Sequence, residues 1–140
     1  MFVTIYTDIS GVDGKWAYSC YIKCDKGVHS DTGIISELCH DTNHAEMIAI
    51  VTGVKSALNR FKGISRILVV TDSINAQYSL WRGSKHKKYH QIIDEFRVLE
   101  EKVDKIMIKW TKGHRSDDSD RAYLNNKCDK RSREALRKIV

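Results

Sequence analysis

The 140-residue sequence has no proline, no internal repeat, no low-complexity tract and no linker-like stretch. These absences exclude proline-rich and repeat architectures, so we expect one domain covering residues 1–140. No apolar run approaches the roughly 20 residues that a membrane-spanning helix needs. The N-terminus also lacks the basic and apolar regions of a signal peptide, and we therefore expect a cytoplasmic protein.

Cysteine is sparse, and the four residues are Cys20, Cys24, Cys39 and Cys128. In a cytoplasmic protein we expect these thiols to be reduced. Neither the Cys20–Cys24 pair nor the group of Cys39, His40 and His44 has the spacing of a structural zinc site. The sequence therefore gives little support to zinc binding.

Charge is the strongest compositional signal. Hydrophobic residues make up 41% and charged residues 30%, as in an ordinary globular protein. The formal net charge is +6, which favours an anionic partner such as nucleic acid. Charge alone is equally compatible with a basic protein that binds no nucleic acid.

Hydrophobic periodicity predicts five strands and four helices. The expected strands are residues 2–8, 15–24, 28–36, 66–71 and 105–111. The expected helices are residues 43–62, 73–81, 88–103 and 121–139. The first helix has an apolar face with steps of four and three residues, formed by Met47, Val51, Val54, Leu58 and Phe61. We expect Thr42 or Asn43 to cap this helix and Gly63 to end it.

The order of these elements indicates an α/β fold. The first three strands are separated by turn residues at 11–14 and 25–27, which predicts an antiparallel meander. A helix joins the first strand to the fourth, so these two strands can lie parallel and adjacent through a right-handed crossover. The expected sheet therefore has antiparallel strands followed by parallel ones.

Acidic residues occur where these elements end. Two expected strands end in Thr7-Asp8 and Thr71-Asp72, and parallel neighbours bring such ends to one edge of the sheet. Glu46 lies one turn into the first helix. Carboxylates brought together in this way are typical ligands of a hard divalent cation.

Each acid also has an ordinary structural interpretation. Glu46 and Asn43 have the spacing of a capping box, and Asp72-Ser73 has the composition of a helix cap. Asp8 is also compatible with a turn. The convergence of three acids on one edge favours the metal site over these separate explanations.

Two further residues lie near the C-terminus. His114 follows Lys112 and Gly113 in an expected loop, where it suits proton shuttling but is equally typical of a solvated loop. Asp129 lies in an expected basic helix, where a salt bridge with Arg133 is the simpler interpretation.

Five motifs occur in order along the chain: Thr7-Asp8, Ala45-Glu46, Thr71-Asp72-Ser73, Lys112-Gly113-His114 and Asn125-x-x-Cys128-Asp129. This series resembles that of type 1 ribonuclease H. The resemblance implies a ribonuclease H-like fold, with a five-stranded mixed sheet flanked by helices. It also implies an Mg²⁺- or Mn²⁺-dependent endonuclease that cleaves the RNA strand of RNA/DNA hybrids and leaves 5′-phosphate and 3′-hydroxyl ends.

The resemblance also assigns roles to single residues. It makes Asp8, Glu46, Asp72 and Asp129 metal ligands, and His114 the group that assists proton transfer or product release. Asn43 resembles a residue that contacts the minor groove of the hybrid. The sequence departs from the family pattern at Ile9-Ser10-Gly11, at His44 and in the acid-rich stretch 115–121. Four close carboxylates repel one another, and two cations about 3.5–4 Å apart would relieve that repulsion.

Residues 81–90 mix cationic and aromatic side chains, which suits contact with phosphates and sugars. The alternative is an exposed helix junction that buries Trp81 and Tyr89. The expected substrate-binding residues are Asn43, Ser73, Trp81, Arg82, Lys85, Lys87, Lys88 and Lys112. We expect a monomer. Two rival functions are a DNA nuclease of the integrase or resolvase type and a non-catalytic hybrid-binding module.

Overall fold

The computed structural model describes residues 1–35 and 38–112. Its strands are β1 (Phe2–Val12), β2 (Lys15–Cys24), β3 (Gly27–Ile34), β4 (Arg66–Thr71) and β5 (Lys105–Trp110). Its helices are α1 (Thr42–Arg60), α2 (Ile74–Arg82), the short 3₁₀ helix η1 (Lys87–Tyr89) and α3 (His90–Glu100). The expected helix 121–139 lies outside the described residues.

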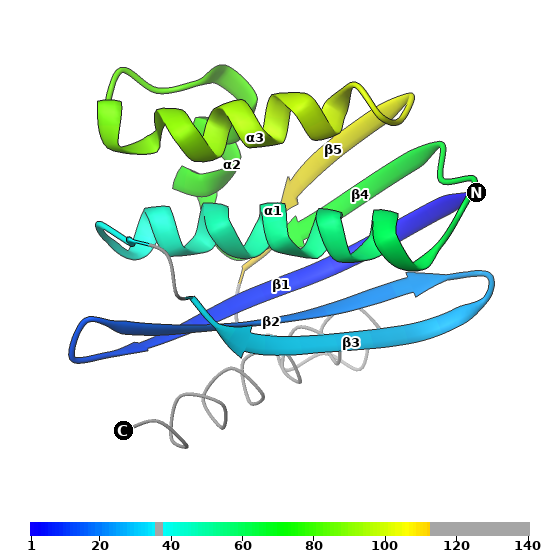
Figure 1. Cartoon of the computed structure of the whole chain (residues 1–140), viewed down its shortest axis with the longest axis horizontal. Coiled ribbons are helices and arrows are strands. Elements are labelled where there is room, and N and C mark those ends of the chain that lie inside the picture. The colour runs from blue at the N-terminus through cyan, green and yellow to red at the C-terminus, as the bar shows by residue number, and fades with distance from the viewer. Residues whose placement is uncertain (36–37, 113–140) are drawn as a thin grey trace.

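The five strands form one mixed sheet in the order β3-β2-β1-β4-β5. Strands β1 to β3 pair antiparallel, whereas β4 pairs parallel with both β1 and β5. The expected meander and the expected β1–β4 pairing are therefore confirmed (Figure 1). The β1–β4 ladder ends at the pair Tyr6–Val70, two residues before Asp8 and Asp72 respectively.

Strand β1 is longer than expected and does not end at Asp8. Its antiparallel ladder with β2 continues to the pair Val12–Lys15. Only Asp13 and Gly14 form the turn, with φ values of 53° and 76° that suit the tightest hairpins. Asp8 is therefore held inside a strand, opposite Ser19 of β2, rather than at a strand end.

Helix α1 begins one residue earlier than expected, because Asp41 is its N-cap. The Asp41 side chain accepts a hydrogen bond from the backbone N–H of His44. The helix ends at Arg60, since Phe61 is already extended. Neither Thr42 nor Asn43 caps this helix, and the capping interpretation of Asn43 and Glu46 is wrong.

The main core lies between α1 and the sheet, and α1 packs on β1 and β2 while α3 packs on α1. Its largest buried side chains include Ile5, Ile22, Val51 and Phe96. Tyr6, Tyr21 and Val70 form a second buried cluster with Leu68. Because strand side chains alternate, Tyr6 lies on the sheet face opposite to Ile5.

Gly53 allows α1 to approach the sheet closely. A Cβ atom at this position would lie 3.0 Å from Cγ2 of Ile5 and 3.4 Å from Cγ2 of Thr7. Close packing of α1 on the sheet therefore explains why a glycine stands inside this helix.

Within the described ranges, no helix combines the length and the apolarity needed to cross a membrane.

We expect Gly53→Val to lower the free energy of unfolding by about 2 kcal/mol, because the added methyl groups overpack the contact with Ile5 and Thr7. Urea denaturation would measure this change. Asn59→Val introduces the same side chain at an exposed position of α1 and should change stability by less than about 0.5 kcal/mol. Equal losses in the two variants would contradict the close-packing explanation.

Candidate metal centre

Three acids from distant parts of the sequence meet at one place. Carboxylate oxygens of Asp8, Glu46 and Asp72 all lie within 4.8 Å of one another. Asp8 comes from β1, Glu46 from α1, and Asp72 follows directly after β4. Asp8 and Glu46 are only 8% and 6% exposed, so the cluster is largely shielded from water.

Strand pairing and backbone contacts fix the positions of the two aspartates. Because β1 and β4 are parallel and in register, Asp8 and Asp72 leave the shared ladder side by side. The Asp72 carbonyl accepts a hydrogen bond from Nε1 of Trp110 at 3.1 Å. Oδ1 of Asp8 accepts one from the N–H of Ile9 at 2.9 Å.

Asp72 does not act as the cap of α2. Oγ of Ser73 accepts the hydrogen bond from the N–H of Ala76, so Ser73 is the N-cap. The side chain of Asp72 is therefore directed to the acidic cluster rather than to the helix end. This assigns Ser73 a structural role, and its expected role in substrate binding stays a prediction.

Glu46 has the most unusual environment of the three acids. Its Oε2 atom is buried and has no hydrogen-bond partner among the described residues. Burial, the charges of Asp72 and Asp8, and a hydrogen bond with Asp72 all raise the pKa of Glu46 well above its ordinary value. Without a cation, the cluster therefore disfavours three simultaneous negative charges.

These features fit a hard divalent cation. Carboxylate oxygens are the preferred ligands of Mg²⁺ and Mn²⁺, and an unpartnered buried oxygen is the feature that a metal bond satisfies. Among the residues that the structure describes, no other group of histidine, cysteine or acidic side chains has this arrangement. The other two expected catalytic residues, His114 and Asp129, lie outside the described residues, as does the acid-rich stretch 115–121.

A family model for RNase H matches residues 2–137. The chain belongs to the RNase H family. Among curated protein sequences, none matches it.

Solved structures of RNase H proteins share this fold over nearly the whole chain. RNase H1 from Halobacterium salinarum NRC-1 has a TM-score of 0.78 at 18% identity, covering 99% of both chains. LC11-RNase H1, solved in complex with an RNA/DNA hybrid, has a TM-score of 0.76 at 16% identity, covering 98% of both chains. The N-terminal RNase H domain of Rv2228c from Mycobacterium tuberculosis, solved as a fusion with maltose-binding protein, has a TM-score of 0.74 at 15% identity, covering 99% of both chains. At these identities the likeness shows a common fold.

The cationic and aromatic residues of this RNase H family member are distributed over α2 and the segment after it. Trp81 is 64% exposed, and the Arg82 guanidinium lies 4.8 Å from the centre of its ring. Trp81 is thus on the surface, contrary to the alternative that buries it. Lys85, Lys87 and Lys112 are exposed as well.

Two residues of this region, Lys88 and Tyr89, already have contacts within the protein. Lys88 forms an ion pair with Asp41, with 2.7 Å between Nζ and Oδ2, so its charge is already partly compensated. Tyr89 is buried in the core, as the alternative for this segment proposed.

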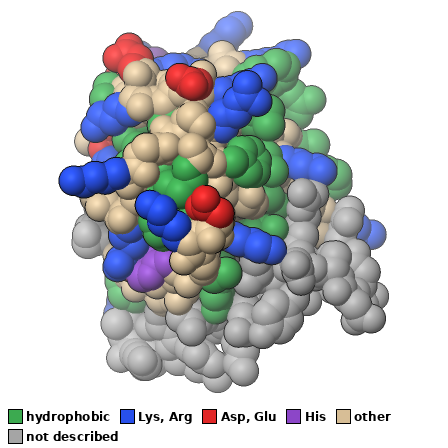
Figure 2. Space-filling model, turned by 90° about the vertical axis from the view of Figure 1, so that its right-hand side faces the viewer, with side chains coloured by type: hydrophobic (Ala, Val, Ile, Leu, Met, Phe, Trp, Pro, Cys, Tyr) green, Lys and Arg blue, Asp and Glu red, His purple; other side chains and the backbone are tan. Residues whose placement is uncertain are grey.

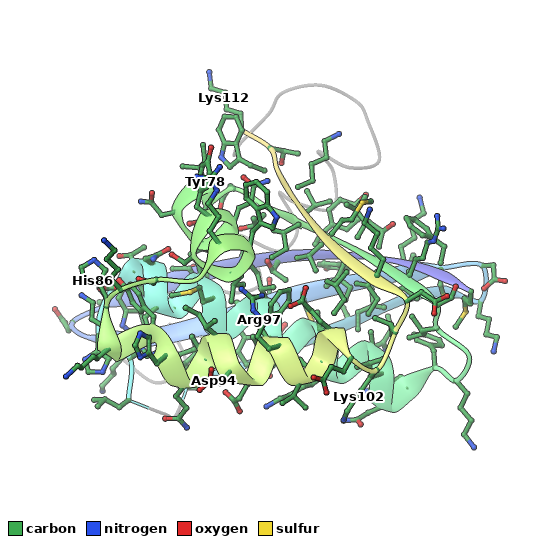
Figure 3. The ribbon with its side chains drawn as sticks, turned by 90° about the horizontal axis from the view of Figure 1, so that it is seen from above. Tyr78, His86, Asp94, Arg97, Lys102 and Lys112 are labelled. Atoms are coloured by element: carbon green, nitrogen blue, oxygen red, sulfur yellow. The ribbon has the colours of Figure 1, made fainter. Side chains whose placement is uncertain are left out.

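The sequence did not identify Tyr78 or Asp41 as candidate functional residues. Tyr78 is exposed beside Trp81, and Arg82 also contacts its ring. Tyr78 lies four residues after Ile74 and three before Trp81, and residues at these spacings lie on one face of a helix. The sequence could therefore have indicated that Tyr78 lies beside Trp81. Figure 3 shows that Tyr78 and Lys112 lie toward the same end of the molecule.

Positive charge is also present away from this region. Lys and Arg side chains are spread over the face shown in Figure 2, with fewer acidic side chains between them. Among the described residues, positive charge is therefore not confined to the region near the acidic cluster.

We expect Glu46→Gln to raise the stability of the metal-free protein. The substitution removes the cost of either ionising Glu46 in a repulsive cluster or binding a proton there, and it should add about 1 kcal/mol, or about 3 °C in Tm. Thermal denaturation in EDTA would measure this, and Mg²⁺ should then raise Tm less in Glu46→Gln than in the wild type.

Glu95→Gln is the matched control, because Glu95 is partly exposed and pairs with Lys55 at 3.0 Å. It should not raise Tm. A loss of stability in metal-free Glu46→Gln would contradict the repulsion inferred at the cluster.

Proposed function

We propose that this protein is an endoribonuclease that hydrolyses the RNA strand of RNA/DNA hybrids with two divalent cations. Mg²⁺ is the expected cofactor and Mn²⁺ a substitute, and the products carry 5′-phosphate and 3′-hydroxyl ends. The observation that carries this proposal is the cluster of Asp8, Glu46 and Asp72 in a member of the RNase H family.

The residues of the chain supply position and charge. Asp8, Glu46 and Asp72 would hold the cations, with Asp129 as the proposed fourth ligand and His114 as the group for proton transfer or product release. Bound divalent cations supply the positive charge that phosphodiester hydrolysis needs at the attacking and leaving oxygens. Burial of Asp8 and Glu46 strengthens these electrostatic interactions, because little water screens them.

Asn43 supports the choice of a hybrid substrate. It lies in the first turn of α1, three residues before Glu46, and its Nδ2 donates to Oγ of Ser79 at 3.3 Å. Its Oδ1 atom is buried and has no hydrogen-bond partner among the described residues, and we propose that the side chain turns outward so that this oxygen accepts a hydrogen bond from the substrate. A 2′-hydroxyl is a donor that distinguishes RNA from DNA. The solved complex of LC11-RNase H1 with an RNA/DNA hybrid is consistent with this substrate class.

Exposed cationic and aromatic side chains supply the proposed binding contacts with the substrate. Trp81 and Arg82 form a stacked pair on α2, which suits a sugar or base beside a phosphate. Lys85, Lys87 and Lys112 extend the positive surface and suit phosphate contacts.

We expect Asp8→Asn and Asp72→Asn to abolish hybrid cleavage, with a loss of at least about 1,000-fold in kcat, because each removes a charged ligand of the cations. Cleavage of an end-labelled hybrid in Mg²⁺ would measure this, and circular dichroism would check that the fold is retained. Glu95→Gln should cleave like the wild type.

The same assay separates the rival functions when it is run on one sequence as hybrid, double-stranded DNA and double-stranded RNA. Selective cleavage of the hybrid supports the proposal. Preferential DNA cleavage would indicate a DNA nuclease, and binding without cleavage in Mg²⁺ or Mn²⁺ would indicate a binding module. Residual turnover near the wild-type level in Asp8→Asn would refute the assigned metal centre.

We expect Trp81→Ala to raise KM for the hybrid about tenfold, because stacking on an aromatic side chain contributes about 1–3 kcal/mol. The kcat value should change little, since Trp81 holds no metal. Val98→Ala removes a similarly exposed apolar side chain from α3 and serves as the control in steady-state kinetics. If both variants match the wild type, Trp81 has no role in substrate binding.

A further inference from the structure

The two oxygens of the Asp41 carboxylate have separate partners. Oδ1 accepts a hydrogen bond from the N–H of His44 at 2.8 Å and thereby caps α1. Oδ2 accepts a hydrogen bond from the hydroxyl of Tyr89 at 2.6 Å and lies 2.7 Å from Nζ of Lys88. One carboxylate therefore joins the start of α1 to η1, across 48 residues of sequence to Tyr89.

The surroundings of this contact keep it in one place. Tyr89 is only 6% exposed, and its ring packs against the rings of His44 and His86 at 5.7 and 5.8 Å. Nζ of Lys88 also lies 5.1 Å from the centre of the Tyr89 ring. An aromatic anchor and a cation thus approach Asp41 from the same short helix.

Asp41 is charged throughout the neutral range. Burial alone would raise its pKa, but hydrogen bonds from Lys88, Tyr89 and the His44 backbone lower the pKa to about 2. The contact with Lys88 and Tyr89 is therefore charge-assisted at every pH at which the protein would act on nucleic acid.

The contact joins two segments of the protein that have different proposed roles in the reaction. Helix α1 carries Asn43 in its first turn and Glu46 in its second. Residues 84–88, here called the basic loop although the last two belong to η1, carry Lys85 and Lys87 and lead into Tyr89. Figure 3 shows His86 of this loop at the end of the molecule where α1 begins.

We propose that Asp41 is a positioning residue that holds the basic loop at a fixed place relative to Asn43 and Glu46. This inference rests on the proposed function. A phosphate bound by Lys85 or Lys87 would then lie at a set distance from the acidic cluster, and that distance selects the phosphodiester bond that is cleaved. Lys88 serves the clamp rather than the substrate.

Asp41→Asn separates the clamp from the helix cap. Asparagine caps helices as well as aspartate does, so Oδ1 can still accept from His44. The amide that replaces Oδ2 is a donor and cannot accept from Tyr89 or Lys88. Tyr89→Phe removes one arm of the clamp without touching the cap and is the second variant.

The expected change in KM is opposite to the change that loss of the negative charge alone would produce. Removal of a negative charge beside the basic loop would by itself strengthen binding of a polyanion. Loss of positioning instead raises KM for the hybrid about fivefold, with kcat within about twofold, because the loop must be ordered on binding. On an end-labelled hybrid of defined sequence, the cut positions should spread over more bonds than in the wild type.

Amide hydrogen exchange would test the clamp without catalysis. Residues 84–90 should exchange faster in Asp41→Asn and in Tyr89→Phe, while α1 keeps its protection. Glu95→Gln breaks a Lys–carboxylate pair that also involves α1, away from its N-terminal cap, and should leave exchange of residues 84–90, KM and the cut positions unchanged.

Unchanged exchange at residues 84–90 together with unchanged or tighter hybrid binding in Asp41→Asn would overturn the proposal. Equal loss of protection along α1 would also overturn it, since the residue would then be only a cap. A wild-type protein that cleaves no hybrid would refute the proposed function, whereas exchange at residues 84–90 would still decide whether the clamp exists.

Discussion

The mutual repulsion of three carboxylates is the constraint around which this structure is organised. Asp8, Glu46 and Asp72 have oxygens within 4.8 Å of one another, and two of the three residues are almost fully buried. A fold that only minimised its own free energy would avoid this arrangement, because buried like charges are unfavourable. The parallel pairing of β1 with β4 and the close packing of α1 on the sheet nevertheless impose it. Such a destabilised cluster is typical of a site at which a ligand compensates the cost.

Much of this arrangement could be predicted from the sequence, for identifiable reasons. Strands β2 and β4 have the predicted bounds. The apolar residues alternate in β2 and are continuous in β4, and clear turn or helix signals border both strands. The parallel neighbourhood of β1 and β4 followed from the helix between them and from the handedness of such crossovers. Those two facts alone placed Asp8 beside Asp72. The motif series then added the family, which the match over residues 2–137 confirms.

Other features depended on tertiary contacts that a local pattern does not contain. Asp8 was placed at a strand end, but β1 continues because β2 supplies a partner up to Val12. Thr42 and Asn43 were equally good candidates for the cap of α1, yet Asp41 takes that role. Asp41 also contacts Lys88 and Tyr89, which follow α2 in the sequence. A run of lysines looks uniform in sequence, although Lys88 is paired while Lys85 and Lys87 are exposed. Long-range partners, rather than propensities, decided each of these cases.

The glycine at position 53 has a consequence for the proposed metal centre. It lies seven residues, or about two helical turns, after Glu46 on the same helix. The absence of a side chain there sets how deeply α1 sits over β1, and α1 in turn carries the Glu46 oxygens toward Asp8. Magnesium accepts only a narrow range of oxygen distances, whereas calcium is far more tolerant. In the proposed metal centre, the depth at which α1 rests on the sheet would therefore limit the range of ionic radii that the three carboxylates can accommodate.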